Sequence, residues 1–446
     1  MELNKSNIIS NGLYWWFWIA TCYGFVCDEW LPTDIAPIIA RFILIMCDCA
    51  IMLMGLWCTR NKTDIFITAS FVGLSFISTC IINHLPLITW VNGSRVFWGF
   101  IFVVPVLRYI CDDEELHDKF MEKWDKALLY WLYVQAFCIT WEYFEYGAGD
   151  PGGGSFGILG YSGTVSMSIY AASFYLIRKR LDTSHLWFSI LQNWKYIALL
   201  IPTFMNETKI SFILLFLYFV LLIPINRKTA TRLLLGIPII AGIIAIAIFI
   251  FSSLTMYNGS FTADDVFTVD FIEKYLYTDI EQSESTAKWS IENMENETNM
   301  PDVPRLTKII MLPIVFNQES GNILTGLGVG HFMNGGIFGT TELFENWDWL
   351  LWGTNPMIFF TIIQIGIIGM LWVLFVWASW FTYKPQKFKK RDINMQLLVL
   401  AIVLSTLVYG QFFRIIPFCQ ILLTILFLSW QKQELPETNI ITEKNK

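Results

Sequence analysis

The chain has 446 residues, of which 55% are hydrophobic, 17% aromatic and only 15% charged, with a net charge of −7 and a mean hydropathy of +0.52. Because soluble globular domains carry about 25% charged residues, this composition excludes an ordinary soluble protein and indicates many membrane-spanning helices. The net charge alone identifies no partner, because the placement of charges matters more than their sum; we expect contacts with membrane lipids and none with nucleic acid.

Apolar runs of about 20 residues, separated by short polar breaks, indicate the membrane spans in chain order. They cover residues 12–27, 36–58, 64–83, 88–108, 126–145, 158–177, 188–204, 209–225, 233–252, 356–381, 395–410 and 415–430. The sequence therefore predicts an all-α integral membrane protein with about 12 transmembrane helices.

Lysine and arginine concentrate in every second loop, and the positive-inside rule assigns such loops to the cytoplasm. The basic loops are those after the second, fourth, sixth, eighth and tenth spans. Outside one long loop, the notable cations of the opposite loops are Arg95, Lys209 and Arg414. Both termini are therefore predicted to lie in the cytoplasm.

One external linker is far longer than the others and divides the chain. Residues 1–252 hold the first nine spans, 253–355 form the long loop, 356–430 hold the last three spans, and 431–446 form a cytoplasmic tail. Long loops in compact proteins are often functional. The acidic first half of this loop predicts a mobile, partly helical cap over a cavity or, alternatively, a solvated spacer.

The second half of the long loop opens with a predicted amphipathic helix that lies at the membrane surface. The residues that recur there at helical spacing are Arg305, Ile309, Leu312 and Phe316. The helix runs into the glycine-rich stretch "NILTGLGVGHFM".

Gly326, Gly328 and Gly330 alternate in this stretch, beside His331. A phosphate-binding loop needs a following lysine or a soluble strand–helix–strand unit, and the sequence offers neither, so a nucleotide site is not predicted. The three glycines instead predict a tight turn whose backbone approaches a neighbour closely. The alternative is a turn that only returns the chain to the bilayer.

The order of these features resembles the O-antigen polymerase and ligase family of bacterial membrane proteins. The matching pieces are Arg305, the helix after it, the turn "GNILTGLGVGHF" and the next span, which begins "NPMIFFTIIQIGIIGML". Upstream, "NETKISFILLFLYFVLLIP" is similar to the family's span with a basic residue at its external mouth, with Lys209 where arginine is common. The resemblance covers roughly residues 190–380, and the order of the motifs carries most of its weight.

This resemblance implies a GT-C-like glycosyltransferase architecture in the bacterial cytoplasmic (inner) membrane. It implies action on undecaprenyl-pyrophosphate-linked glycans at the outer face of that membrane, without a metal or another cofactor. A chain-length regulator protein is a further partner that it suggests. The residues also favour a metal-free site, since the chain has no Asp-x-Asp motif and its histidines are scattered at positions 84, 117, 185 and 331.

Transfer of a glycan from a polyprenyl pyrophosphate needs cations that hold the departing pyrophosphate. Basic residues at membrane depth are candidates, because each costs about 2.5 to 3.5 kcal/mol on insertion scales. The pyrophosphate-binding candidates are Lys209, Arg305, Arg414 and Arg95. The alternative roles are snorkelling to the surface for Lys209 and a salt bridge to the acidic cap for Arg305. Arg41 is explained more simply by pairing with Asp48, two turns further along the same helical face.

A base is also needed to take the proton of the attacking hydroxyl. His331 has a suitable ordinary pKa near 6.5, although a lone histidine is often only a hydrogen-bond donor. Glu342 and Glu345 are equivalent catalytic candidates. Further acidic candidates are Glu142, Glu145 and Asp348. Nearby, Trp347, Trp349 and Trp352 predict an interfacial belt or, alternatively, a platform for stacking sugars.

One departure from the family decides between its two activities. Ligases typically present a His-Asn pair shortly before the span that opens the C-terminal part, and the comparable place here reads Thr354-Asn355-Pro356. The missing histidine favours a polymerase, whose acceptor is the sugar of another lipid-linked repeat unit. A ligase-type glycan transferase and a flippase or transporter of lipid-linked oligosaccharides are the alternatives. The absence of an internal repeat argues against the transporter.

Overall fold

The computed structural model describes residues 2–146, 153–159, 303–332, 341–351 and 355–385, together with isolated positions such as Gln192 and several between Lys390 and Gln431. This part of the chain is mostly helical, which confirms the helical class. A short antiparallel pairing joins β1 (Lys390–Arg391) to β2 (Trp430–Gln431).

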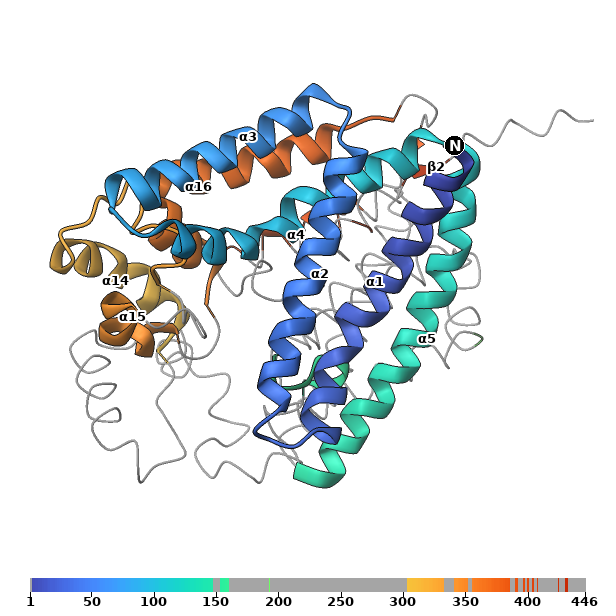
Figure 1. Cartoon of the computed structure of the whole chain (residues 1–446), viewed down its shortest axis with the longest axis horizontal. Helices are drawn as coiled ribbons and strands as arrows, with labels where there is room; N and C mark the ends of the chain where they lie inside the picture. The colour runs from blue at the N-terminus through green and yellow to red at the C-terminus, as the bar shows by residue number, and fades with distance from the viewer. Residues whose placement is uncertain are drawn as a thin grey trace, which may run out of the picture.

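Three long helices run side by side and form the first layer (Figure 1). They are α1 (Glu2–Trp30), α2 (Ala36–Cys58) and α5 (Glu114–Tyr146). Aromatic side chains fill the contact between α1 and α5: the ring of Phe17 lies 4.8 Å from that of Trp124 and 6.3 Å from that of Trp131. All three rings are buried, so this contact is part of the main hydrophobic core.

A second layer crosses the first at a steep angle (Figure 1). It contains α3 (Lys62–Phe76), which continues into the π-helical turn η1 (Ile77–Ile82), then α4 (Leu87–Asp112) and α16 (Met357–Thr382). α3 and α16 lie side by side, and the indole of Trp372 donates to Ser70 Oγ at 2.9 Å. α4 joins the layers, because the absent side chain of Gly55 on α2 lets the backbone of Phe102 approach closely.

Four helices in the described part of the chain are long and apolar enough to cross a membrane: α2, α3 with η1, α4 and α16. They correspond to the spans predicted at 36–58, 64–83, 88–108 and 356–381. The predicted spans 12–27 and 126–145 lie inside α1 and α5, which extend beyond them. The remaining six predicted spans, and the acidic half of the long loop, lie wholly or mostly outside the described residues.

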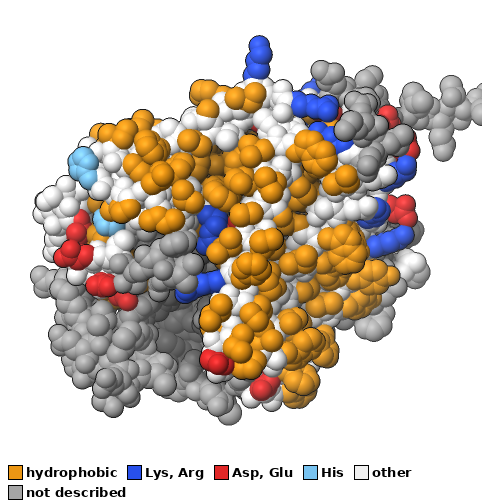
Figure 2. Space-filling model, in the orientation of Figure 1, with side chains coloured by type: hydrophobic (Ala, Val, Ile, Leu, Met, Phe, Trp, Pro, Cys, Tyr) orange, Lys and Arg blue, Asp and Glu red, His pale blue; other side chains and the backbone are white. Residues whose placement is uncertain are grey.

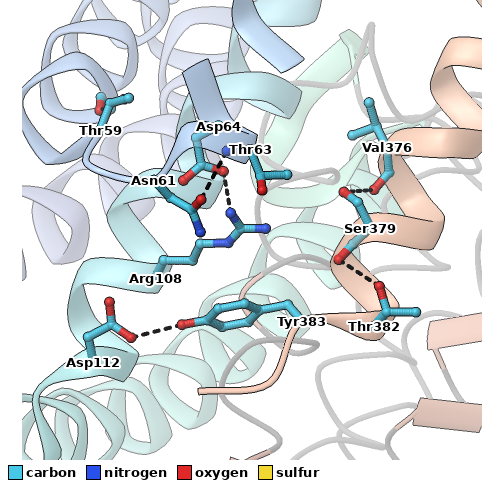
Figure 3. Close-up of polar contacts among 11 residues, drawn as sticks. Thr59, Asn61, Thr63, Asp64, Arg108, Asp112, Val376, Ser379, Thr382 and Tyr383 are labelled. Atoms are coloured by element: carbon cyan, nitrogen blue, oxygen red, sulfur yellow. Dashed lines mark hydrogen bonds and ion pairs between the residues drawn. The ribbon is translucent and has the colours of Figure 1, made fainter. Parts of the chain in front are cut away.

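Polar side chains connect α3, α4 and the end of α16 at one end of the second layer (Figure 3). Arg108 forms a buried ion pair with Asp64 at 2.6 Å, and its guanidinium lies 4.6 Å from the ring centre of Tyr383. The Tyr383 hydroxyl donates to Asp112 at 2.9 Å. Burial, reinforced by the Asp112 carboxylate, raises the pKa of Tyr383, so the hydroxyl keeps its proton. Loops predicted to share one side of the membrane therefore meet here.

A short buried segment, η2 (Gly154–Leu159), packs between α1 and α5. Its backbone is held by two side chains of α5: Glu142 accepts from the amide of Gly154 at 2.7 Å, and Gln135 accepts from that of Ser155 at 2.8 Å. Glu142, considered above as an acidic candidate, thus serves to satisfy buried backbone donors. Glu145 lies one turn on and accepts from the indole of Trp141.

Candidate functional site

The centre of the candidate site is a break in α16. At Gly366 the backbone adopts φ 72° and ψ −175°, which interrupts the helix. Such a break leaves carbonyls before it and amides after it without helical partners. Four backbone hydrogen bonds from the glycine-rich stretch satisfy them: Leu327 N to Ile363 O (2.8 Å), Gly328 N to Gln364 O (3.0 Å), Ile367 N to Ile323 O (3.0 Å) and Ile368 N to Leu324 O (3.2 Å). The segment 323–328 is therefore inserted into the interruption of α16, and we call this segment the wedge.

The three predicted glycines make this close approach possible. Gly326, Gly328 and Gly330 have φ values of 79°, 95° and 85°, a region that other residues rarely adopt. A Cβ at Gly326 would lie 2.5 Å from the carbonyl of Gln364, and one at Gly330 would lie 2.4 Å from the carbonyl of Thr89. The glycine turn therefore lies directly against the backbone of α16 and of α4.

The π-helical turn η1 supplies the remaining bonds to this segment. Ser78 Oγ donates to the carbonyl of Thr325 at 2.6 Å, and Thr79 Oγ1 accepts from the amide of Val329 at 2.9 Å. Asn83, just after η1, donates to the carbonyl of Gly326 at 3.0 Å. Side chains of residues 78–83 and the backbone of α16 therefore hold the segment 323–329 between them, and we call this assembly the platform.

A second hydrophobic core, separate from the main one, sits on this platform. It joins α14 (Arg305–Gln318), the glycine turn, α15 (Glu342–Trp347), η6 (Asp348–Leu351) and the first half of α16. Trp347 and Trp349 are buried inside it, and the indole of Trp347 donates to Glu319 at 2.6 Å. Both predictions for Trp347 and Trp349, an interfacial belt and a surface for stacking sugars, were therefore wrong, because other side chains cover the two rings. Trp352 lies outside the described residues.

The buried face of α14 carries a cation. Lys308, one turn after the half-buried Arg305, is fully buried, and its Nζ donates to Asn355 Oδ1 at 3.3 Å. Asn355 precedes α16 and donates in turn to the carbonyl of Leu351 at 2.9 Å. A buried ammonium is costly unless it meets polar or negatively charged groups.

Lys308 was not among the residues that the sequence predicted for the site. The expected helix is present, yet its buried face includes Lys308, Met311, Leu312, Val315 and Phe316. Ile309 is only half-buried and Arg305 lies at the first residue. The available signal was a lysine at i, i+3, i+4 and i+7 spacing with apolar residues, which places a charge in an otherwise apolar stripe.

The backbone of His331 contacts the start of α15, the helix that carries the two candidate glutamates. His331 Nδ1 lies 3.0 Å from the carbonyl of Leu327, which only accepts, so the neutral ring carries its proton on Nδ1 and leaves Nε2 as the basic atom. Thr341, the N-cap of α15, donates to the carbonyl of His331 and accepts from the amide of Phe344. Glu342 and Glu345 are exposed in the first turn of the same helix.

Burial lowers the pKa of His331 below its ordinary value of 6.5, against an opposing effect of the hydrogen bond to Leu327. If Nε2 is the base, the rate should stay constant from about pH 8 down to about 6.5 and fall only at lower pH. The variant His331→Asn keeps a donor for the Leu327 carbonyl. Its initial rate should be lower by about 100-fold or more, and should not show the fall at low pH, in the assay of the function proposed below.

The lowered pKa of His331 also makes the folding stability depend on pH. Because the folded pKa of His331 is lowered, the unfolded chain binds the proton more readily. The contribution of His331 to stability is therefore complete above the ordinary pKa of 6.5 and decreases as the pH falls below it. If the reaction rate falls at the same low pH in the wild type and in His331→Asn, His331 is not the base.

Arg95, a predicted pyrophosphate ligand, has an acidic partner inside the protein. It forms an ion pair with the buried Asp48 of α2, with 3.1 Å between Nη1 and Oδ2. The expected pairing of Arg41 with Asp48 was therefore wrong, because the partner of Asp48 comes from a neighbouring helix. Since a carboxylate already holds the Arg95 guanidinium, we leave Arg95 out of the proposed site. Lys209 and Arg414 lie outside the described residues.

No family model matches the chain, and no curated protein matches it in sequence. The interpretation of this site therefore depends on its own residues. These are a buried lysine and a half-buried arginine on α14, a neutral histidine after the glycine turn, and two exposed glutamates on α15.

Proposed function

We propose that the chain is a polymerase of undecaprenyl-pyrophosphate-linked oligosaccharide repeat units, acting at the outer face of the bacterial cytoplasmic membrane. The observation that carries this proposal is the buried Lys308 on α14, one turn from Arg305 and bonded to Asn355 before α16. Cations on a firmly packed helix suit a diphosphate, because preorganised charges stabilise a leaving group without reorganisation.

The proposed reaction is glycosyl transfer from one lipid-linked chain to another. A sugar hydroxyl of the acceptor attacks the anomeric carbon of the donor, and the bond between that carbon and the pyrophosphate oxygen breaks. The pyrophosphate leaves with the bonding electrons and is held by Arg305 and Lys308, together with Lys209 from the eighth predicted span. The hydroxyl proton passes to His331 Nε2 or to a carboxylate of Glu342 or Glu345.

Replacing Arg305 by alanine is expected to reduce the amount of long polymer by about 100-fold at equal protein level, because one group that stabilises the leaving pyrophosphate is lost. Surface polysaccharide ladders provide the measurement, with Lys209→Ala tested in parallel. Single repeats should persist while longer bands vanish. Lys119→Ala is a matched control, since Lys119 is an exposed cation that pairs with Glu115 on α5.

Loss of every repeat from the lipid A core in Arg305→Ala would instead indicate the ligase activity. Unchanged ladders in both Arg305→Ala and Lys209→Ala would contradict the proposed pyrophosphate site. Arg305→Lys separates charge from geometry, because lysine keeps the charge but loses the bidentate donors of arginine.

The broken helix α16 favours one second candidate, a transporter of lipid-linked oligosaccharides. Transporters often place a substrate at interrupted helices, and α16 is interrupted at Gly366. Against this function, backbone bonds from the segment 323–328 already occupy the interruption. Purified protein given labelled repeat units distinguishes the two: new glycosidic bonds without ATP support polymerisation, whereas movement between leaflets without a new bond supports transport.

A further inference from the structure

Two cations share one aromatic ring at the end of the molecule that holds the N-terminus. Lys5 Nζ lies 4.9 Å from the ring centre of Tyr109, and the Arg60 guanidinium lies 5.4 Å from the same centre. Lys5 also lies 5.2 Å from the ring of Trp57 and donates to its carbonyl at 3.0 Å. We call Lys5, Trp57, Arg60 and Tyr109 the N-terminal cation cluster.

This arrangement differs from that of other cations at the same end. Lys119 and Lys126 each form an ion pair with a glutamate one turn away on α5. Among the residues that the structure describes, neither Lys5 nor Arg60 has an acidic partner within salt-bridge distance. Both cations lie near the same ring of Tyr109, so an anion that contacts both is attracted by two positive charges.

The surface next to the cluster is apolar. Ile8, one turn from Lys5 on α1, is 47% exposed, Leu53, one turn before Trp57 on α2, is 62% exposed, and Trp57 itself is 50% exposed. Figure 2 shows lysine and arginine side chains gathered at this end of the molecule, with a broad hydrophobic face over the neighbouring helices. A cationic patch that borders an apolar face matches a lipid, whose phosphate and acyl chains are joined in the same way.

We propose that the N-terminal cation cluster binds the phosphate of an anionic membrane lipid, whose acyl chains lie along the exposed apolar side chains of α1 and α2. Lys5 and Arg60 contact the phosphate, while Tyr109 and Trp57 hold the two cations in place. This inference depends on the membrane-spanning character of α2 and its neighbours. It is independent of the glycan transfer proposed for α14 and α15.

The test uses the full-length protein in an uncharged detergent, with lipid binding followed by native mass spectrometry and by thermal unfolding. Dioleoylphosphatidylglycerol should bind and raise the unfolding temperature, whereas dioleoylphosphatidylcholine and inorganic phosphate should not. A basic residue at a membrane surface is worth about fivefold in affinity for anionic lipid. Arg60→Gln should therefore weaken phosphatidylglycerol binding about fivefold, and Lys5→Gln with Arg60→Gln roughly 25-fold.

Lys126→Gln is the matched control, because it removes a paired cation from the same end of the molecule. The proposal is overturned if Lys126→Gln weakens binding as much as Arg60→Gln, since that result indicates a diffuse field and no site. Equal protection by inorganic phosphate, or unchanged lipid binding in the double variant, overturns it as well. Arg60 is exposed, so the single variant remains informative even if the double variant does not fold.

Discussion

Replacing Lys308 by methionine is expected to lower the rate of glycan polymerisation by roughly 100- to 1000-fold, the usual cost of removing a preorganised charge from a leaving group. The folded protein should survive this change. Methionine has a similar shape and suits the apolar neighbours Met311 and Leu312, while the Asn355 side chain loses one hydrogen bond. Loss of the hydrogen bond to Asn355 by itself should lower the free energy of unfolding by about 1 to 3 kcal/mol.

Initial rates with labelled lipid-linked repeats and thermal unfolding of the purified protein together measure this outcome. Lys308→Arg should retain part of the activity, because the charge is kept while its position changes. Lys119→Met is the control for loss of a positive charge far from the site. An inactive Lys308→Met protein whose unfolding temperature has also collapsed would identify Lys308 as a structural residue, and full activity would remove it from the mechanism.

Replacing Gly326 by alanine is expected to destabilise the protein by at least about 2 kcal/mol and to reduce its yield in membranes. The backbone there has φ 79°, and the new Cβ would lie 2.5 Å from the carbonyl carbon and oxygen of Gln364. These are backbone atoms, so no rotation of a side chain relieves the contact. The wedge would have to move away from α16, which leaves backbone groups of residues 363–368 without hydrogen-bond partners. Thermal unfolding in detergent measures the effect.

Gly73 offers a matched control on α3, because a Cβ added there meets no atom within 4 Å. Gly73→Ala should be neutral or should stabilise the protein by about 0.5 to 1 kcal/mol, since alanine favours the helix. If Gly326→Ala and Gly73→Ala unfold at the same temperature, the wedge does not contribute to stability.

The ends of the helices show what hydropathy can and cannot predict. α2 occupies the predicted range 36–58, because charged or turn-forming residues bound its apolar run on both sides. α5 begins at Glu114, well before the predicted span 126–145, because its first three turns are amphipathic and rich in charge. Charged residues such as Lys119 favour helix as strongly as leucine, yet a hydropathy profile excludes them.

The features that the sequence did not predict depend on contacts between distant segments. Nothing in the apolar run around Gly366 distinguishes a broken helix from a continuous one, because glycine is common in transmembrane helices. The pairing of Asp48 illustrates the same limit. Spacing along one helix favoured Arg41, whereas packing of α2 against α4 brought Arg95 closer. By contrast, the helix from Arg305 and the glycine turn follow from local patterns and are present.

The wedge also constrains the order of assembly during synthesis. Ser78 donates to a carbonyl 247 positions later in the chain, and the segment that it holds also fills the interruption of α16. The ribosome makes η1 first, then the wedge, and α16 last. Until α16 is made, the amides of Leu327 and Gly328 lack their acceptors, and without the wedge α16 enters lipid with backbone groups that have no partner. Nascent chains halted before residue 357 should therefore be early substrates of membrane quality control, however well the helices α1 to α5 insert.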